Sequence, residues 1–137
     1  PQLQPSKEAR PALAALQKAV TEGRNAEVPA LGQAALAVAK TPVDRYFAHQ
    51  LQMRPALALN NEPLLLASLL GALETGVPQG AELANYTLLA ARLSFNQGAA
   101  DAAASARAAT LAEQAVTLDA NNPDAHYILG LVRNRQK

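Results

Sequence analysis

Helix-stopping residues interrupt the sequence at nearly regular intervals, and this spacing constrains the fold more than any other feature. Pro, Gly, Asn and Asp gather near six places, and most segments between them are roughly 14–18 residues long. The breaks lie near Glu22–Asn25, Lys40–Pro42, Asn60–Pro63, Gly76–Gly80, Gln97–Ala100 and Asp119–Pro123. Seven segments joined by such short connections predict antiparallel helix hairpins.

The residues between the breaks favour helices over strands. Alanine dominates them, and it is the best helix former because it loses no side-chain entropy on folding. β-branched residues never form an alternating run. Half of the residues are hydrophobic but only 4% are aromatic, so the core must be built from Ala and Leu. We therefore predict an all-α fold of about seven helices in a single domain spanning 1–137.

Several breaks carry residues that cap helices. Thr41-Pro42-Val43-Asp44 has the pattern of a capping box with proline at the first helical position. Further N-cap candidates are Ser6, Asn61, Asp101 and Asn122, and Gly23, Gly76 and Gly98 fall where helices should stop. Together they predict helix pairs at about 6–40, 42–76 and 80–119, and a final helix at 122–136.

Two segments carry more specific predictions. Pro55 should kink or end its helix near Arg54, because proline lacks an N–H and clashes with the preceding turn. The segment Leu64–Leu73 is apolar nearly all round, which predicts a central helix in which Leu69 and Leu73 are nearly fully buried.

The chain also repeats itself. Tyr46, Tyr86 and His126 are each separated from the next by 40 residues, and neighbouring positions align at the same offset. Residues Ala115–Gly130 read as the end of one helix, a turn and the start of the next, with a Leu-Gly pair at Leu129-Gly130. On these residues the chain resembles the tetratricopeptide repeat family, as a divergent bacterial member.

The resemblance implies helix pairs stacked as a short right-handed solenoid, which bind a protein or peptide in a concave groove. The groove is lined by the first helix of each pair. By this resemblance the groove positions are Phe47, Arg54, Thr87, Phe95, Tyr127, Asn134 and Arg135, with Arg92 beside them. Aromatic and Arg side chains suit such a groove because they dominate binding energy at interfaces. The Lys/Asn clamp that some members use for a terminal carboxylate is not reproduced here.

Other classes of function find little support. The twelve basic residues are spread along the chain, whereas nucleic-acid binding needs a basic stripe. There is no cysteine, and the two histidines, His49 and His126, lie in different repeats, so no metal or cofactor site is expected. No Gly-x-Ser-x-Gly turn or Gly-rich phosphate loop is present, and we expect no enzyme. The longest apolar stretch is too short to insert in a membrane.

Three readings of function stay open. The first is a non-catalytic protein- or peptide-binding scaffold or adaptor. The second is a self-association module, and the third is a small-molecule-binding helical domain. The sequence starts at Pro1 without a signal-like segment. We take the chain as a mature form or a piece of a longer protein, with a periplasmic or secreted location favoured over a cytoplasmic one.

The last helix carries the case for self-association. No partner helix follows it in the sequence, and Ile128, Leu131 and Val132 spread around much of its circumference at about 100° per residue. We therefore expect an apolar strip of these three residues, covered by a second copy in a homodimer or by further residues of a longer chain.

Overall fold

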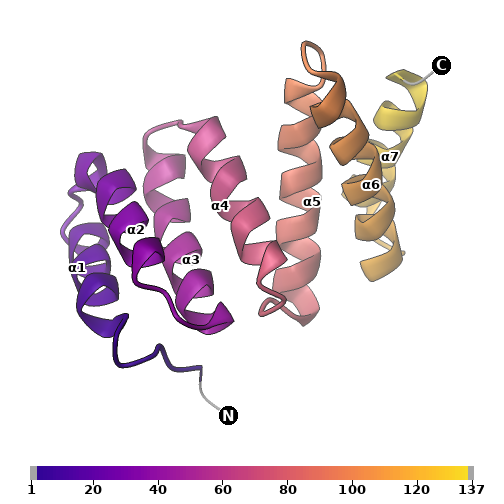
Figure 1. The fold of residues 1–137 in the computed structure, drawn as a ribbon. Coiled ribbons are helices and arrows are strands. Elements are labelled where there is room, and N and C mark those ends of the chain that lie inside the picture. The colour runs from indigo at the N-terminus through magenta and orange to yellow at the C-terminus, as the bar shows by residue number, and fades with distance from the viewer. Residues whose placement is uncertain (1–2, 136–137) are drawn as a thin grey trace. The chain divides into compact units, whose positions relative to one another are not determined.

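The computed structural model describes residues 3–135, which contain seven α-helices and no strand (Figure 1). The helices are α1 (Arg10–Thr21), α2 (Val28–Ala37), α3 (Pro42–Ala58), α4 (Glu62–Glu74), α5 (Gly80–Gln97), α6 (Ala102–Leu118) and α7 (Pro123–Arg135). One short 3-10 helix, η1 (Asn25–Glu27), precedes α2. The all-α prediction with about seven helices is confirmed, while the stacking of pairs as a solenoid stays a prediction.

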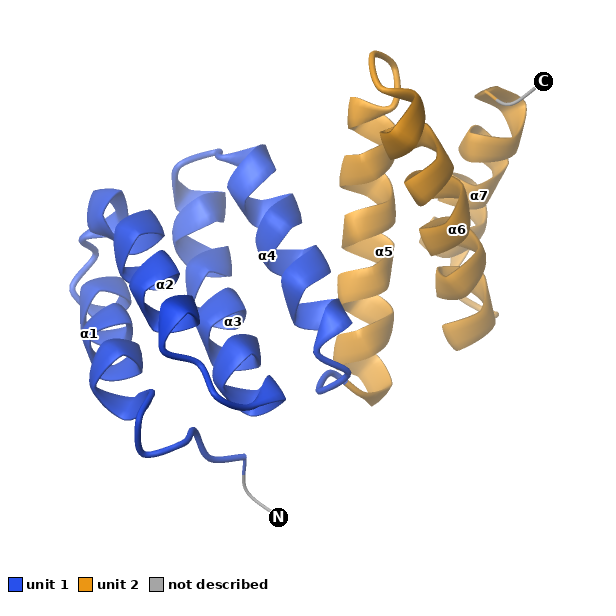
Figure 2. Ribbon diagram, viewed as in Figure 1, with its two compact units in different colours: residues 1–78 blue, residues 79–137 orange. Residues whose placement is uncertain are grey.

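The chain forms two compact units, Pro1–Pro78 and Gln79–Lys137 (Figure 2). Unit 1 contains the first two predicted helix pairs, and unit 2 contains the third pair and the final helix. The division therefore falls at a predicted break, near Gly76–Gly80. The single domain of 1–137 stays a prediction.

In unit 1, α1 packs against α2 and α3, and α3 also packs against α4. Its core is built from small and branched aliphatic side chains, as the scarcity of aromatic residues requires. The buried members of this core are Ala9, Leu13, Leu16, Ala19, Val28, Ala35 and Ala48. Glycines bring two helix pairs close: the side chain of Gln52 occupies the space beside Gly32, and that of His49 the space beside Gly71. A Cβ at either glycine would overlap those side chains, so the lack of a side chain at each position makes room for this packing.

In unit 2, α6 packs against both α5 and α7, and α5 also contacts α7. Alanines line the α5–α6 interface, including Ala90, Ala91, Ala104 and Ala108, all at most 1% exposed. Arg107 spans the same two helices, donating from Nε to the buried Ser94 hydroxyl at 2.9 Å. Small residues allow the two helix backbones to lie close together, and one satisfied polar link fixes their register.

The predicted N-caps are largely confirmed. Thr41 and Asp44 form the reciprocal capping box at the start of α3. Asn61, Asp101 and Asn122 accept backbone N–H donors at the starts of α4, α6 and α7. Ser6 is different, because α1 begins at Arg10 and the Ser6 hydroxyl accepts from the Ala9 N–H at 3.3 Å, in the turn before the helix.

Two predictions about helix interiors need correction. The helix end predicted near Arg54 is wrong, because α3 continues through Pro55 to Ala58. The Pro55 ring is almost fully buried, so apolar burial offsets the lost backbone hydrogen bond. In α4, Leu69 is only 1% exposed as predicted, whereas Leu73 is half-buried rather than fully covered.

Candidate functional site

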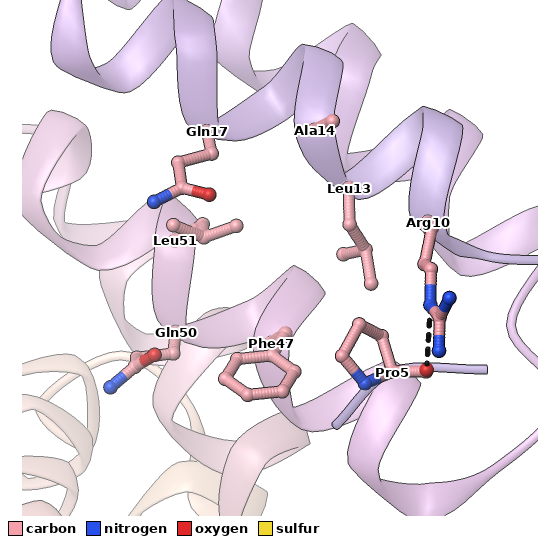
Figure 3. A pocket seen from close by; sticks show the side chains of 8 residues that line it. All are labelled: Pro5, Arg10, Leu13, Ala14, Gln17, Phe47, Gln50 and Leu51. Carbon is pink, nitrogen blue, oxygen red and sulfur yellow. Dashed lines mark hydrogen bonds between the residues drawn. The ribbon is translucent and has the colours of Figure 1, made fainter. Parts of the chain in front are cut away.

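A cavity of about 380 Å³ opens in unit 1 between α1, α3 and the segment before α1 (Figure 3). Its lining is mostly apolar, with polar side chains toward its ends. The lining residues are Pro5, Arg10, Leu13, Ala14, Gln17, Phe47, Gln50 and Leu51. Helices α1 and α3 are the first helices of the two pairs in unit 1, so the cavity lies where the repeat resemblance expects a binding surface.

The α1 wall comes from one stripe of that helix. Arg10, Leu13, Ala14 and Gln17 follow the spacing i, i+3, i+4, i+7, which places them on one face. Leu13 is 6% exposed and joins the core behind the wall, whereas Ala14 is exposed. Because Ala14 carries only a methyl group, the middle of the wall stays open.

The α3 wall uses the same spacing. Phe47, Gln50 and Leu51 line the cavity, and Phe47 and Leu51 are half-buried against the core of unit 1. The Phe47 ring also lies 5.5 Å from the Tyr46 ring at an angle of 57°. A partly exposed aromatic ring fixed from behind is the kind of rigid apolar surface that interfaces favour.

The third wall is held by a buried carboxylate. The Asp44 carboxylate is 0% exposed and accepts from the Ser6 N–H and the Ser6 hydroxyl, both at 2.6 Å. It also accepts from the N–H groups of Lys40 and Thr41, at 2.8 and 3.1 Å. These bonds join the segment before α1 to the start of α3 and so hold Pro5 against the cavity.

The hydrogen bonds also set the ionisation of this carboxylate. Burial alone would raise the pKa of Asp44, but the donors from Ser6, Lys40 and Thr41 outweigh burial and lower that pKa to about 2. The side chain is therefore ionised in the folded protein near neutral pH.

Among the described residues that line the cavity, Arg10 is the one charged side chain. It lies at one end and donates from Nε to the Pro5 carbonyl at 3.4 Å. Arg54 is exposed on α3 and lies seven residues after Phe47, which places it on the same helix face. Arg24, which does not line the cavity, forms ion pairs with Glu22 and Glu27.

The predicted groove residues are divided between the two units. Phe47 lines the cavity and Arg54 extends its α3 face, both in unit 1. In unit 2, the Arg135 guanidinium lies 3.6 Å from the centre of the Phe95 ring and also donates to the Phe95 carbonyl. Arg92, Tyr127 and Asn134 are exposed, with Tyr127 at 65%. The structure thus brings Phe95 and Arg135 together.

Thr87 is placed differently from the prediction. It is only 2% exposed, so its side chain cannot line an open groove. It lies on the face of α5 that also carries the buried Ala90, Ala91 and Ser94, at helical spacing from it. This threonine in the middle of α5 therefore belongs to the interior of unit 2.

The predicted apolar strip on α7 also needs correction. Ile128 and Val132 are 4% and 2% exposed, so one chain covers both, and Leu131 is half-buried. The packing of α7 against both α5 and α6 explains this, because two neighbours cover a wider arc than the single neighbour we expect from the sequence. The outward face instead carries Tyr127, Gly130 and Asn134.

The sequence-based prediction missed the contribution of α1 and of Pro5. The first helix pair matches the repeat pattern least, so no groove position was assigned to it. A usable signal existed: Arg10, Leu13, Ala14 and Gln17 repeat the spacing of Phe47, Gln50, Leu51 and Arg54.

The histidines serve packing and local hydrogen bonding. His49 fills the space beside Gly71, and burial lowers its pKa. Nε2 of the exposed His126 lies 2.6 Å from the Ala120 carbonyl oxygen. Among the described residues there is no group of three or more His, Asp or Glu side chains that could hold a metal ion.

Comparisons of the chain with protein-family models, with curated proteins and with solved structures each find no match. Between residues 3 and 135, no helix combines the length and hydropathy that crossing a membrane requires.

Proposed function

We propose that this protein is a non-catalytic protein- or peptide-binding module, a divergent relative of the tetratricopeptide repeat proteins. The cavity between α1 and α3 is the observation that carries the proposal. It lies between the first helices of two successive pairs and has an apolar wall, a fixed aromatic ring and polar groups at its ends. A short segment of a partner would insert an apolar side chain against Phe47, while its backbone contacts Gln17 and Gln50.

The size and lining of the cavity also allow a comparison with the alternative function, binding of a small molecule. Its volume lies within the range of about 300–1,000 Å³ that such sites occupy. Catalytic sites and tight small-molecule sites usually bring several titratable groups together, however, and Arg10 is the one charged residue in this lining. An apolar cavity with few polar groups therefore suits one anchor residue of a longer peptide better than it suits a small-molecule ligand.

Filling the cavity tests the proposal. Peptides selected from a random display library on the wild-type protein should bind the Ala14→Phe variant about tenfold or more weakly, because the added ring takes the anchor's place. Fluorescence anisotropy with the selected, labelled peptides measures this. Ala14 is exposed, so the fold should tolerate the change.

Ala15→Phe is the matched control. Ala15 is the next residue of α1, is equally classed as exposed and does not line the cavity. It should leave peptide affinity unchanged. Selection of no peptides, or equal affinity of both variants and the wild type, would remove the proposed function.

Self-association remains the second candidate, favoured by the exposed side of α7. Tyr127 is 65% exposed and a Cβ at Gly130 would meet no other atom within 4 Å, so this side of the helix has no partner in unit 2. If it mediates dimerisation, analytical ultracentrifugation at micromolar concentrations should show a dimer that Tyr127→Glu converts to a monomer. A wild-type protein that sediments as a monomer throughout would exclude this candidate.

A further inference from the structure

We infer that the segment bound at the α1–α3 cavity is acidic: an apolar anchor residue with carboxylate side chains on its flanks. This inference rests on the proposed peptide binding at the same cavity and specifies the chemistry of the ligand. Three observations carry it: the apolar lining, the exposed Arg10 at one end with the exposed Arg54 farther along the α3 face, and the lack of a carboxylate among the described lining residues.

The two arginines are available to a ligand. Arg10 and Arg54 are both exposed, and within residues 3–135 neither forms an ion pair with an Asp or Glu. Arg24 offers the contrast, because Glu22 and Glu27 each lie 2.9 Å from its guanidinium. The hydrogen bond from Arg10 to the Pro5 carbonyl uses Nε and leaves the terminal nitrogens of its guanidinium for an acceptor. Guanidinium groups bind carboxylates through two parallel hydrogen bonds, which favours Asp or Glu over neutral acceptors.

The acidic side chain that holds the segment before α1 is already engaged. Asp44 starts the same helix that carries Phe47, but its carboxylate is buried and accepts four hydrogen bonds. It therefore neither pairs with the two arginines nor presents a free acceptor to a ligand.

Helix geometry gives the spacing of the motif. Arg54 follows Phe47 by seven residues, or about 10 Å along the helix axis at about 1.5 Å per residue. A peptide in the polyproline II conformation covers nearly that length in about three residues, at about 3.1 Å per residue, and completes one turn in them, so side chains three positions apart point to the same side. A peptide that places an apolar side chain against Phe47 therefore presents its third neighbour on one side to Arg54. Arg10 lies at the other end of the cavity, beside Pro5 (Figure 3), which is where the opposite flank of such a peptide would lie.

Synthetic peptides test the inference directly. One probe is an acetylated and amidated nonapeptide with a central leucine, a glutamate about three positions away on each side and serine elsewhere. A second replaces both glutamates by lysines, and a third keeps the glutamates but replaces the central leucine by serine. Blocking both ends ensures that the terminal carboxylate does not contribute.

We expect the wild-type protein to bind the glutamate peptide about tenfold more tightly than the lysine peptide at low salt, with the preference shrinking as salt increases. The serine-centred peptide should lose binding. The double variant Arg10→Glu and Arg54→Glu should reverse the preference and favour the lysine peptide. Arg45→Glu is the control, since Arg45 is exposed on α3 but lies on a different face from Phe47, and it should keep the wild-type preference.

The outcomes separate this inference from the proposed function. Equal binding of the glutamate and lysine peptides, or a preference that survives the double charge reversal, overturns the acidic ligand. The proposed peptide-binding function would still be supported if display-selected peptides bind and the Ala14→Phe substitution weakens their binding. If display peptides bind and neither designed peptide does, the charge argument is wrong while the cavity still functions. If no peptide of either source binds, both fail. Circular dichroism of each variant verifies that the helices are retained.

Discussion

Replacing Asp44 by alanine is expected to lower the free energy of unfolding by about 2–5 kcal/mol, because it leaves buried donors without an acceptor. The wild-type carboxylate accepts four hydrogen bonds from Ser6, Lys40 and Thr41. Urea denaturation followed by circular dichroism measures the loss. Ser6→Ala is the graded control, since it removes one donor to the carboxylate and the long hydrogen bond from the Ala9 N–H, keeps the Ser6 N–H donor, and should cost about 1 kcal/mol. A loss from Asp44→Ala no larger than that of Ser6→Ala would contradict the role assigned to the carboxylate.

We also expect the contribution of Asp44 to the free energy of unfolding to depend on pH. Hydrogen bonding lowers the folded-state pKa of Asp44 from 3.8 to about 2, so the ionised form favours the folded state. This contribution is fully present above the unfolded pKa and is lost as pH falls through the folded pKa. The difference in unfolding free energy between wild type and Asp44→Ala should thus be constant near neutral pH and shrink between about pH 4 and pH 2. A difference that stays constant over that window would show that ionisation of Asp44 does not contribute.

Replacing Leu69 by alanine is expected to cost about 2–5 kcal/mol, the range for removing a fully buried leucine and leaving a cavity. Leu69 is 1% exposed in α4 and lies with the buried Leu65, Leu66 and Ala72 on that helix. Its matched control is Leu57→Ala in α3, because Leu57 is 58% exposed and should change stability by less than about 0.5 kcal/mol. Equal effects of the two variants on the urea midpoint would mean that Leu69 is not in the core of unit 1.

The helix boundaries could be predicted from the sequence because capping is a local interaction. Thr41, Asn61, Asp101 and Asn122 each bond to N–H groups two or three residues ahead, so neighbouring residues alone determine whether they cap. The all-α fold could be predicted from composition for a similar reason, because helix propensity belongs to the individual residues.

Burial was harder to predict, since it depends on which helices meet. Thr87, Ile128 and Val132 are covered by neighbours that local spacing does not identify, and Pro55 stays within α3 because its ring is buried. The cavity was missed for a related reason. It requires α1, α3 and Pro5 to converge, and Ser6 reaches Asp44 across 38 residues of sequence. Only Phe47 of its lining was identified in advance.

The bond between Ser6 and Asp44 has a practical consequence for shortening the chain. A version that began at Arg10 would keep all four helices of unit 1 and so look complete by secondary structure. It would nevertheless remove Pro5 from the rim of the cavity and two of the four hydrogen bonds to the Asp44 carboxylate. The irregular residues before α1 are therefore part of the folded unit, and trimming them would damage stability and the binding surface together.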